Sequence, residues 1–242
     1  MKRNTIINMP KIVNMNCYNC GIELSHDTNH VEHIPAKNLF ATYPDEYKQN
    51  LLTVPACYEC NVALYSKIDQ EIRDAVGILN DSDELKKELT AKAVRSIMRK
   101  SNWKDRVFMV DEGKSFDVSF SYNDMESLHI KNFKGLFYAK YGKPISEEYK
   151  IKIIAEGDES NENLQKVNLF MREYLNFETD WSFVGHPQVF RYKIKAMIDG
   201  NDGAFYDGEN VDDAVSVACI MDYHDAIHPL VIAQKKDFIN EQ

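Results

Sequence analysis

The stretches Cys17-Tyr18-Asn19-Cys20 and Cys57-Tyr58-Glu59-Cys60 decide the fold of the first part of this chain. In a C-x-x-C sequence both thiolates can reach a single ion, and two such pairs supply the four ligands of a closed tetrahedral zinc site. We therefore expect a structural Zn²⁺ bound by four thiolates, those of Cys17, Cys20, Cys57 and Cys60.

The composition is that of an ordinary folded protein. The chain has 242 residues, 44% of them hydrophobic, which fits one large or two small domains. No apolar run approaches the ~20 residues that span a bilayer, and the N-terminus is too weakly apolar for a secretory signal. C-x-x-C pairs without an export signal favour the reducing cytoplasm and give no reason to expect a membrane partner. The fifth cysteine, Cys219, lies in an apolar run and is expected to be a buried side chain.

The net charge of −9 is unevenly distributed along the chain. Residues 1–75 carry seven Lys/Arg and nine Asp/Glu, residues 76–110 eight and five, and residues 111–242 fourteen and twenty-four. The three segments therefore have net charges of −2, +3 and −10. The acidic total argues against avid, independent binding to duplex DNA, but it allows cleavage at a locally basic groove.

The N-terminal unit, residues 1–80, has the pattern strand, loop, strand, helix. The first strand is expected over 30–34 and the second over 51–54, each ended by the proline that follows. Apolar residues at near-helical spacing then predict a helix over 61–79.

Residues 81–110 form an expected helical, basic connector. Its helix, over 81–100, carries Leu85, Leu89, Ala93, Ile97 and Met98 as an apolar stripe. The exposed basic face is either an ordinary solvated helix surface or a nucleic-acid contact. The residues expected to touch nucleic acid in the second case are Lys92, Arg95, Arg99 and Lys100.

Residues 111–242 have the pattern of a mixed, mostly antiparallel α+β domain. A strand is expected over 107–110, at the end of the connector. Within the domain, strands are expected over 116–122, 149–155, 189–198 and 215–221, and helices over 124–141 and 163–175. The fold class is therefore α+β, and the acidic domain is a candidate for oligomerisation or for docking to a partner.

Three polar residues near the cysteine pairs can carry chemistry. His33 is a candidate general base, since the unperturbed pKa of histidine is ~6.5. Glu32 and the side-chain oxygen of Asn61 are hard ligands of the kind that Mg²⁺ or Mn²⁺ prefers. A zinc staple between the two cysteine pairs would bring His33 and Asn61 close together, although 28 positions separate them.

At these residues the chain resembles the HNH endonuclease family in its zinc-stapled form. The resemblance covers about 60 residues and rests on Cys17-x-x-Cys20, Glu32-His33-Ile34-x-Pro35 and Cys57-x-x-Cys60-Asn61. It implies a ββα-metal finger in which His33 activates water, while Glu32 and Asn61 bind one catalytic Mg²⁺ or Mn²⁺ ion. The middle Asn of the family corresponds to Asn50 or to Asn38.

The function that the resemblance implies is metal-dependent hydrolysis of DNA phosphodiester bonds. A bacterial or phage setting is expected, such as antiviral defence in which a partner or homodimer formation activates DNA cleavage. The alternative is a zinc-binding module that recognises nucleic acid or protein without catalysis, in which Glu32, His33 and Asn61 have no catalytic role.

Overall fold

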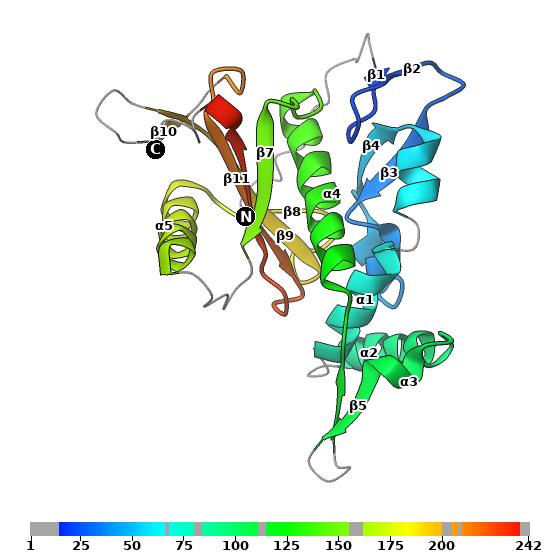
Figure 1. Ribbon diagram of the computed structural model, residues 1–242. Helices are drawn as coiled ribbons and strands as arrows, with labels where there is room; N and C mark the ends of the chain where they lie inside the picture. The colour runs from blue at the N-terminus through cyan, green and yellow to red at the C-terminus, as the bar shows by residue number, and fades with distance from the viewer. Residues whose placement is uncertain are drawn as a thin grey trace.

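A long central helix, α4 (Tyr122–Tyr141), lies between the N-terminal unit on one side and a β-sheet on the other (Figure 1). The computed structural model describes residues 15–65, 68–79, 84–110, 115–154, 162–199, 205–207 and 210–237. Ser121 caps α4, its Oγ atom accepting a hydrogen bond from the Asp124 backbone, and Gly142 ends the helix at φ +74°. The predicted helix over 124–141 is thus confirmed with one additional half-turn at its start.

The N-terminal unit is built from two small antiparallel hairpins. The first pairs β1 (Met15–Asn16) with β2 (Glu23–Leu24), and the second pairs β3 (His30–Ile34) with β4 (Leu52–Ala56). Two short 3₁₀ turns, η1 (Lys37–Phe40) and η2 (Asp45–Lys48), lie between β3 and β4. The strand predicted over 30–34 is confirmed.

The prediction that Pro55 ends the second strand is wrong, because β4 continues to Ala56. Pro55 lies opposite Val31, and its carbonyl accepts a hydrogen bond from the Tyr18 backbone (2.9 Å), away from β3. The N and C=O of one strand residue point to the same side, so the missing N–H of the proline also faces away from β3. The strand therefore continues without losing a ladder hydrogen bond.

The helix predicted over 61–79 is replaced by two segments. A wide π-type turn, η3 (Glu59–Leu64), starts before Asn61, and α1 (Ile68–Leu79) follows. α1 packs against α2 (Glu84–Met98), and the first residues of the predicted second helix, 81–83, lie outside the described residues. α3 (Trp103–Arg106) and the hairpin of β5 (Val107–Val110) and β6 (Ser115–Val118) lead into α4. The second strand of this hairpin ends at Val118, before the predicted end at residue 122.

The C-terminal part is an antiparallel sheet. Within the described residues its strand order is β10-β9-β11-β12-β7, and β8 also pairs with β9. The predicted strands over 149–155, 189–198 and 215–221 are confirmed as β7, β9 and β11, whereas β8, β10 and β12 were not predicted. The bounds are β7 Tyr149–Ile154, β8 Ser182–Phe183, β9 Phe190–Asp199, β10 Phe205–Asp207, β11 Ser216–Tyr223 and β12 Leu230–Lys235.

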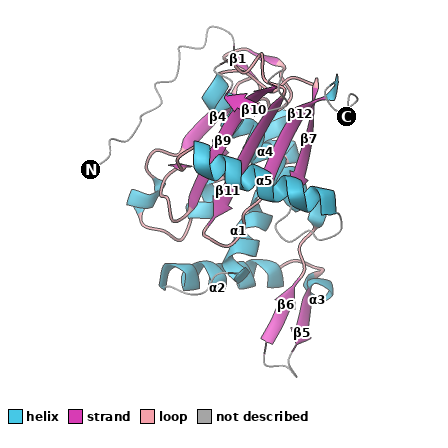
Figure 2. Ribbon diagram, turned by 90° about the vertical axis from the view of Figure 1, so that its left-hand side faces the viewer, coloured by secondary structure: helices cyan, strands magenta, loops and turns pink. Residues whose placement is uncertain are grey.

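Helices cover both faces of this sheet. α5 (Glu162–Glu178) crosses the face opposite α4 (Figure 2). Every residue of β11 is buried, and alternate side chains, such as Cys219 and Ile220, enter the core beside α4 and the core beside α5. The expectation that Cys219 is buried is confirmed, and the α+β class is correct.

The core beside α4 also reaches the N-terminal unit. It contains Ile34 and Val54 from β3 and β4 together with Phe133 and Phe137 from α4 and several residues of β9 and β11. α4 approaches β3 so closely that a Cβ atom at Gly135 would collide with the side chain of Ile34. Of the described helices, none has the length and apolar composition needed to cross a bilayer.

Candidate metal centre and its surroundings

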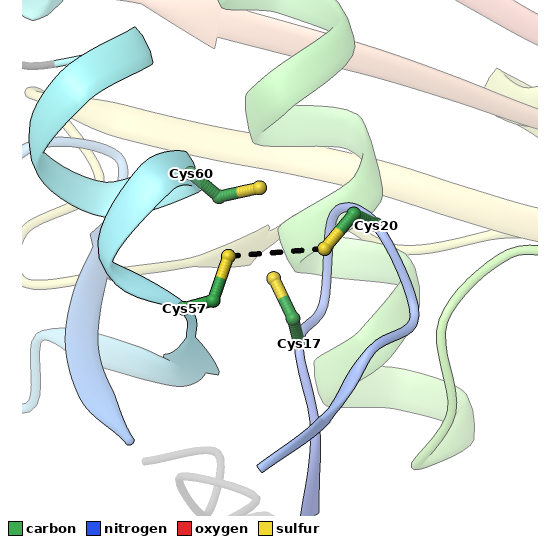
Figure 3. Close-up of side chains that lie close together, drawn as sticks. All are labelled: Cys17, Cys20, Cys57 and Cys60. Carbon is green, nitrogen blue, oxygen red and sulfur yellow. Dashed lines mark hydrogen bonds between the residues drawn. The ribbon is translucent and has the colours of Figure 1, made fainter. Parts of the chain in front are cut away.

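The four predicted zinc ligands converge in the structure. Cys17 and Cys20 come from the β1–β2 hairpin, and Cys57 and Cys60 from the end of β4 and the start of η3 (Figure 3). The hairpin turn is fixed by backbone hydrogen bonds from Cys17 to Ile22 (2.8 Å) and from Gly21 to Cys17 (2.9 Å). Gly21 has φ +74°, a left-handed conformation that glycine adopts without steric cost.

The geometry of these thiols fits a zinc ion. One sulfur from each residue lies within 4.8 Å of all the others. Tetrahedral coordination with Zn–S bonds of about 2.3 Å separates the sulfur atoms by about 3.8 Å, and the Sγ atoms of Cys20 and Cys57 are 3.8 Å apart. The structure therefore supports a closed four-thiolate site of the structural zinc type.

Polar groups around the thiols complete this site. The Nδ2 atom of Asn19 donates a hydrogen bond to Cys60 Sγ (3.2 Å), and Tyr65 and Lys134 hold the Asn19 side chain by donating to Oδ1 (3.2 and 3.0 Å). A zinc ion with four thiolates has a net charge of −2, which the nearby Lys134 ammonium would partly offset. Nothing in the spacing of Asn19, Tyr65 and Lys134 along the sequence pointed to this role.

Glu32 faces the interior of the molecule. Its side chain is buried, and its Oε1 atom accepts a hydrogen bond from the His33 backbone (3.1 Å) and pairs with Lys131 Nζ (3.1 Å). Burial raises the pKa of Glu32, while the charge of Lys131 opposes the shift.

Lys131 also binds a second carboxylate. Its Nζ atom, on a fully buried side chain of α4, lies 2.5 Å from Asp69 Oδ1 at the start of α1. The pKa of Asp69 is raised by burial, and Lys131 again opposes the shift. Glu32, Lys131 and Asp69 thus form a buried charge network that connects β3, α4 and α1. Sequence reasoning missed it, although Lys131 follows Leu128 at helical spacing and both side chains are buried.

His33 extends from the opposite face of β3, because successive side chains of a strand alternate. It is partly exposed, in contrast to the buried Glu32 and Ile34 on either side. Burial lowers the pKa of His33, and the positive charges of Lys37 and Lys131 lower it further. The imidazole is therefore mostly neutral at pH 7 and able to accept a proton.

Asn61 is held at the edge of β3. Its Nδ2 atom donates a hydrogen bond to the Val31 carbonyl (2.9 Å), one residue before Glu32. The Val31 carbonyl is available because Val31 lies opposite Pro55, in the pair whose backbone groups face away from the hairpin. The structure thus brings Asn61 to the Glu32-His33 segment, although Glu32 and His33 leave the strand on opposite faces.

The two candidates for the middle Asn differ in their surroundings. Asn50 has a left-handed backbone (φ 57°), two residues before the start of β4. The Oδ1 atom of Asn38, in η1, is buried and accepts no hydrogen bond from the described residues. Neither observation assigns the role.

The four predicted nucleic-acid contacts line a single cavity. Lys92, Arg95, Arg99 and Lys100 surround about 350 Å³ between α1 and α2, together with Gln70, Arg73 and Ser96. Lys100 is also paired with Glu71, as is Arg106 (2.7 Å). Arg73 was not among the predicted contacts, because it lies on a different helix.

A second group of potential ligand atoms lies at the β11–β12 turn, where Asp222, Asp225 and His228 come within 4.8 Å of one another. The guanidinium of Arg191 already pairs with both carboxylates, Nε with Asp222 and Nη2 with Asp225, at 2.6 Å each. Arg191 therefore offsets one of the two carboxylate charges in this cluster and already occupies both carboxylates.

Comparison with protein-family models, with curated proteins and with solved structures finds no match.

Proposed function

We propose that this chain is a metal-dependent endonuclease of the HNH type that hydrolyses DNA phosphodiester bonds, and that its N-terminal unit is a ββα-metal finger. The observation that carries the proposal is the hydrogen bond from Asn61 to Val31, beside the thiol cluster. It joins the segment after the second cysteine pair to the strand that presents Glu32 and His33. The resemblance requires these two residues and Asn61.

His33 would act as the general base. Its side chain is partly exposed and its pKa is lowered, so it can take a proton from a water molecule at neutral pH. The resulting hydroxide attacks phosphorus, and the bond to the 3′ oxygen breaks.

Glu32 and Asn61 would hold one Mg²⁺ or Mn²⁺ ion, whose role when bound is to offset the charge on the leaving oxygen. The contacts of Glu32 with His33 and Lys131 both use Oε1, so Oε2 is the oxygen that would bind the ion. Asn61 uses Nδ2 to bind Val31, which leaves its Oδ1 atom for the ion.

A second candidate function is a non-catalytic zinc module that binds nucleic acid or protein. The buried network of Glu32, Lys131 and Asp69 favours it, because this network gives Glu32 a role in packing the unit onto α4. In such a module His33 would be one surface residue among others.

The two functions differ in the expected effect of His33→Ala. A nuclease should lose plasmid nicking or linearisation by ~10²-fold or more, as general bases contribute 10²–10⁴-fold, and it should retain its zinc and fold. His26→Ala is the matched control, because the His26 side chain lies in the same unit and is fully exposed. The assay compares plasmid relaxation with Mg²⁺ or Mn²⁺ at equal zinc content.

Metal-dependent cutting that is equal in wild type, His33→Ala and His26→Ala would reject His33 as the base. A protein that binds DNA but never cuts it, whether alone or with a fraction of host-cell extract that contains a partner, would favour the non-catalytic module.

We further propose that the acidic C-terminal part, residues 111–242, mediates dimerisation or docks a partner that gates cutting. Its net charge of −10 makes DNA an unsuitable ligand for it. A purified monomer that cuts DNA alone at full rate would exclude gating.

A further inference from the structure

The cavity between α1 and α2 gathers five basic residues. Arg73 of α1, Lys92 and Arg95 of α2, and Arg99 and Lys100 directly after α2 line it. Lys92 and Arg95 share one face of α2, and Arg73 meets them because α1 packs along α2.

Two of these five charges are already neutralised. Arg73 binds the buried Asp74 through its Nε atom (3.0 Å), and Ser96 holds both residues by accepting from Arg73 Nη2 (2.9 Å) and donating to Asp74 Oδ2 (2.8 Å). Lys100 binds Glu71. These contacts fix the wall of the cavity.

The other three basic residues have no direct partner in the described parts of the chain, where Lys92, Arg95 and Arg99 make no ion pair or hydrogen bond. Burial lowers the pKa of Lys92, and the charges of Arg73, Arg95 and Lys48 lower it further, although Asp74 opposes them. Mutual repulsion of this kind is relieved by an anion, and arginine forks match the oxygen geometry of phosphate.

Two further lysines lie near this cavity and near His33. Lys48 of η2, which also pairs with Asp45 (3.1 Å), is near enough to Lys92 to affect it electrostatically. Lys37 of η1 affects His33 in the same way. η1 and η2 pack against each other, and η1 packs against α1. A strand of DNA, with one negative charge per ~3.4 Å along its axis, is complementary to such a series of separated positive charges, whereas a small free anion would use one position.

We propose that the cavity between α1 and α2 binds a backbone phosphate of the DNA strand, at a position away from the bond that is cut. This inference rests on the endonuclease function proposed above. The cavity would fix the register of the strand across the N-terminal unit, while His33 faces the reacting phosphate. Phosphate contacts of this kind position a protein on DNA without reading its sequence.

The test measures DNA binding separately from cutting. A fluorescent duplex is titrated with full-length His33→Ala protein by anisotropy, at several salt concentrations and without added Mg²⁺ or Mn²⁺. In that background, Arg95→Gln with Arg99→Gln should weaken binding roughly tenfold at low salt. The slope of log K against log salt is negative, and its magnitude should become smaller by about 1, because each neutralised phosphate contributes ~0.9 for duplex DNA.

The control removes the same amount of charge elsewhere. Lys150→Gln with Lys152→Gln takes two exposed lysines from β7, at the edge of the sheet, and should change the affinity by less than about twofold. Equal losses in both double variants, or no loss in the arginine variant, would overturn the proposal. Thermal melts of all variants establish that each is folded.

Inorganic tripolyphosphate distinguishes a strand from a free phosphate compound. If the cavity binds strand phosphate, tripolyphosphate should displace the duplex only at concentrations far above those of duplex phosphate. Tight, Arg95- and Arg99-dependent binding of tripolyphosphate alone would overturn the strand proposal. Failure of the nuclease proposal would appear differently, as wild-type protein that binds DNA through this cavity but does not cut it with any divalent metal.

Discussion

His129 of α4 is buried, and its ring centroid lies 5.5 Å from that of Tyr223. Its Nδ1 atom has no hydrogen-bond partner among the described residues. Burial lowers the pKa of His129 to about 3. The native state therefore keeps this side chain neutral, whereas the unfolded chain protonates it near pH 6.5.

We predict that His129→Leu makes the protein less sensitive to acid. Below pH 6.5 the unfolded state binds the proton and the native state does not, so stability falls by ~1.4 kcal/mol per pH unit until the native pKa is reached. Between pH 6.5 and 4.5 the free energy of unfolding should thus fall by roughly 2–3 kcal/mol more in wild type than in the variant. Urea denaturation across this range measures the difference.

Acid also releases zinc by protonating thiolates, but wild type and His129→Leu share this effect. The difference between them therefore isolates His129. An equal loss of stability in both proteins would show that His129 is not a source of the acid sensitivity.

At the scale of secondary structure, the thiol cluster connects elements that are individually very short. β1 and β2 contribute two residue pairs, and η3 is a six-residue turn. Elements as short as these do not persist alone, and a structural zinc ion couples its binding energy to their folding.

We predict that Cys57→Ser loses bound zinc and unfolds the β1–β2 hairpin and η3. Cys219→Ala is the control: Cys219 is another free cysteine but is buried in β11, outside the thiol cluster, so this variant should keep the zinc content of wild type. Metal analysis by mass spectrometry gives the zinc content, and hydrogen exchange locates the unfolding. A Cys57→Ser protein without zinc but with wild-type protection in residues 15–24 would refute the staple.

At the scale of the whole molecule, the N-terminal unit is attached to α4 by both packing and charge. Ile34 enters the core beside α4, and Lys131 reaches from α4 to Glu32 and Asp69. Removing one member of a buried ion network leaves the remaining charges uncompensated, which typically costs roughly 3–5 kcal/mol.

We predict that Lys131→Met destabilises the protein by roughly 3–5 kcal/mol, or raises the pKa of Glu32 and Asp69 until one of them is protonated. Lys166→Met serves as the control, because Lys166 forms an exposed pair with Glu162 on α5 (2.8 Å). Such a pair contributes ~0.3–0.5 kcal/mol. Chemical denaturation of both variants measures the contrast, and equal effects would show that the buried network does not attach the unit to α4.

The sequence by itself determined the local features of this protein. Two C-x-x-C pairs identified the four converging thiols, because the spacing of ligands along a chain is set by covalent geometry. Periodicity identified β3, α4, β9 and β11, since each buries a face whose apolar pattern lies within one segment. The nuclease function remains a prediction, as does the division into three domains.

Only the tertiary structure decided which distant residues meet. It extended β4 through Pro55, since a proline is tolerated where its nitrogen faces away from the ladder. It added β12, which lies in the sheet between β11 and β7 and pairs with both strands. It joined Lys131 to Glu32 and Arg73 to the basic face of α2. These contacts form when separate helices and strands pack together, so no periodicity within a single segment encodes them.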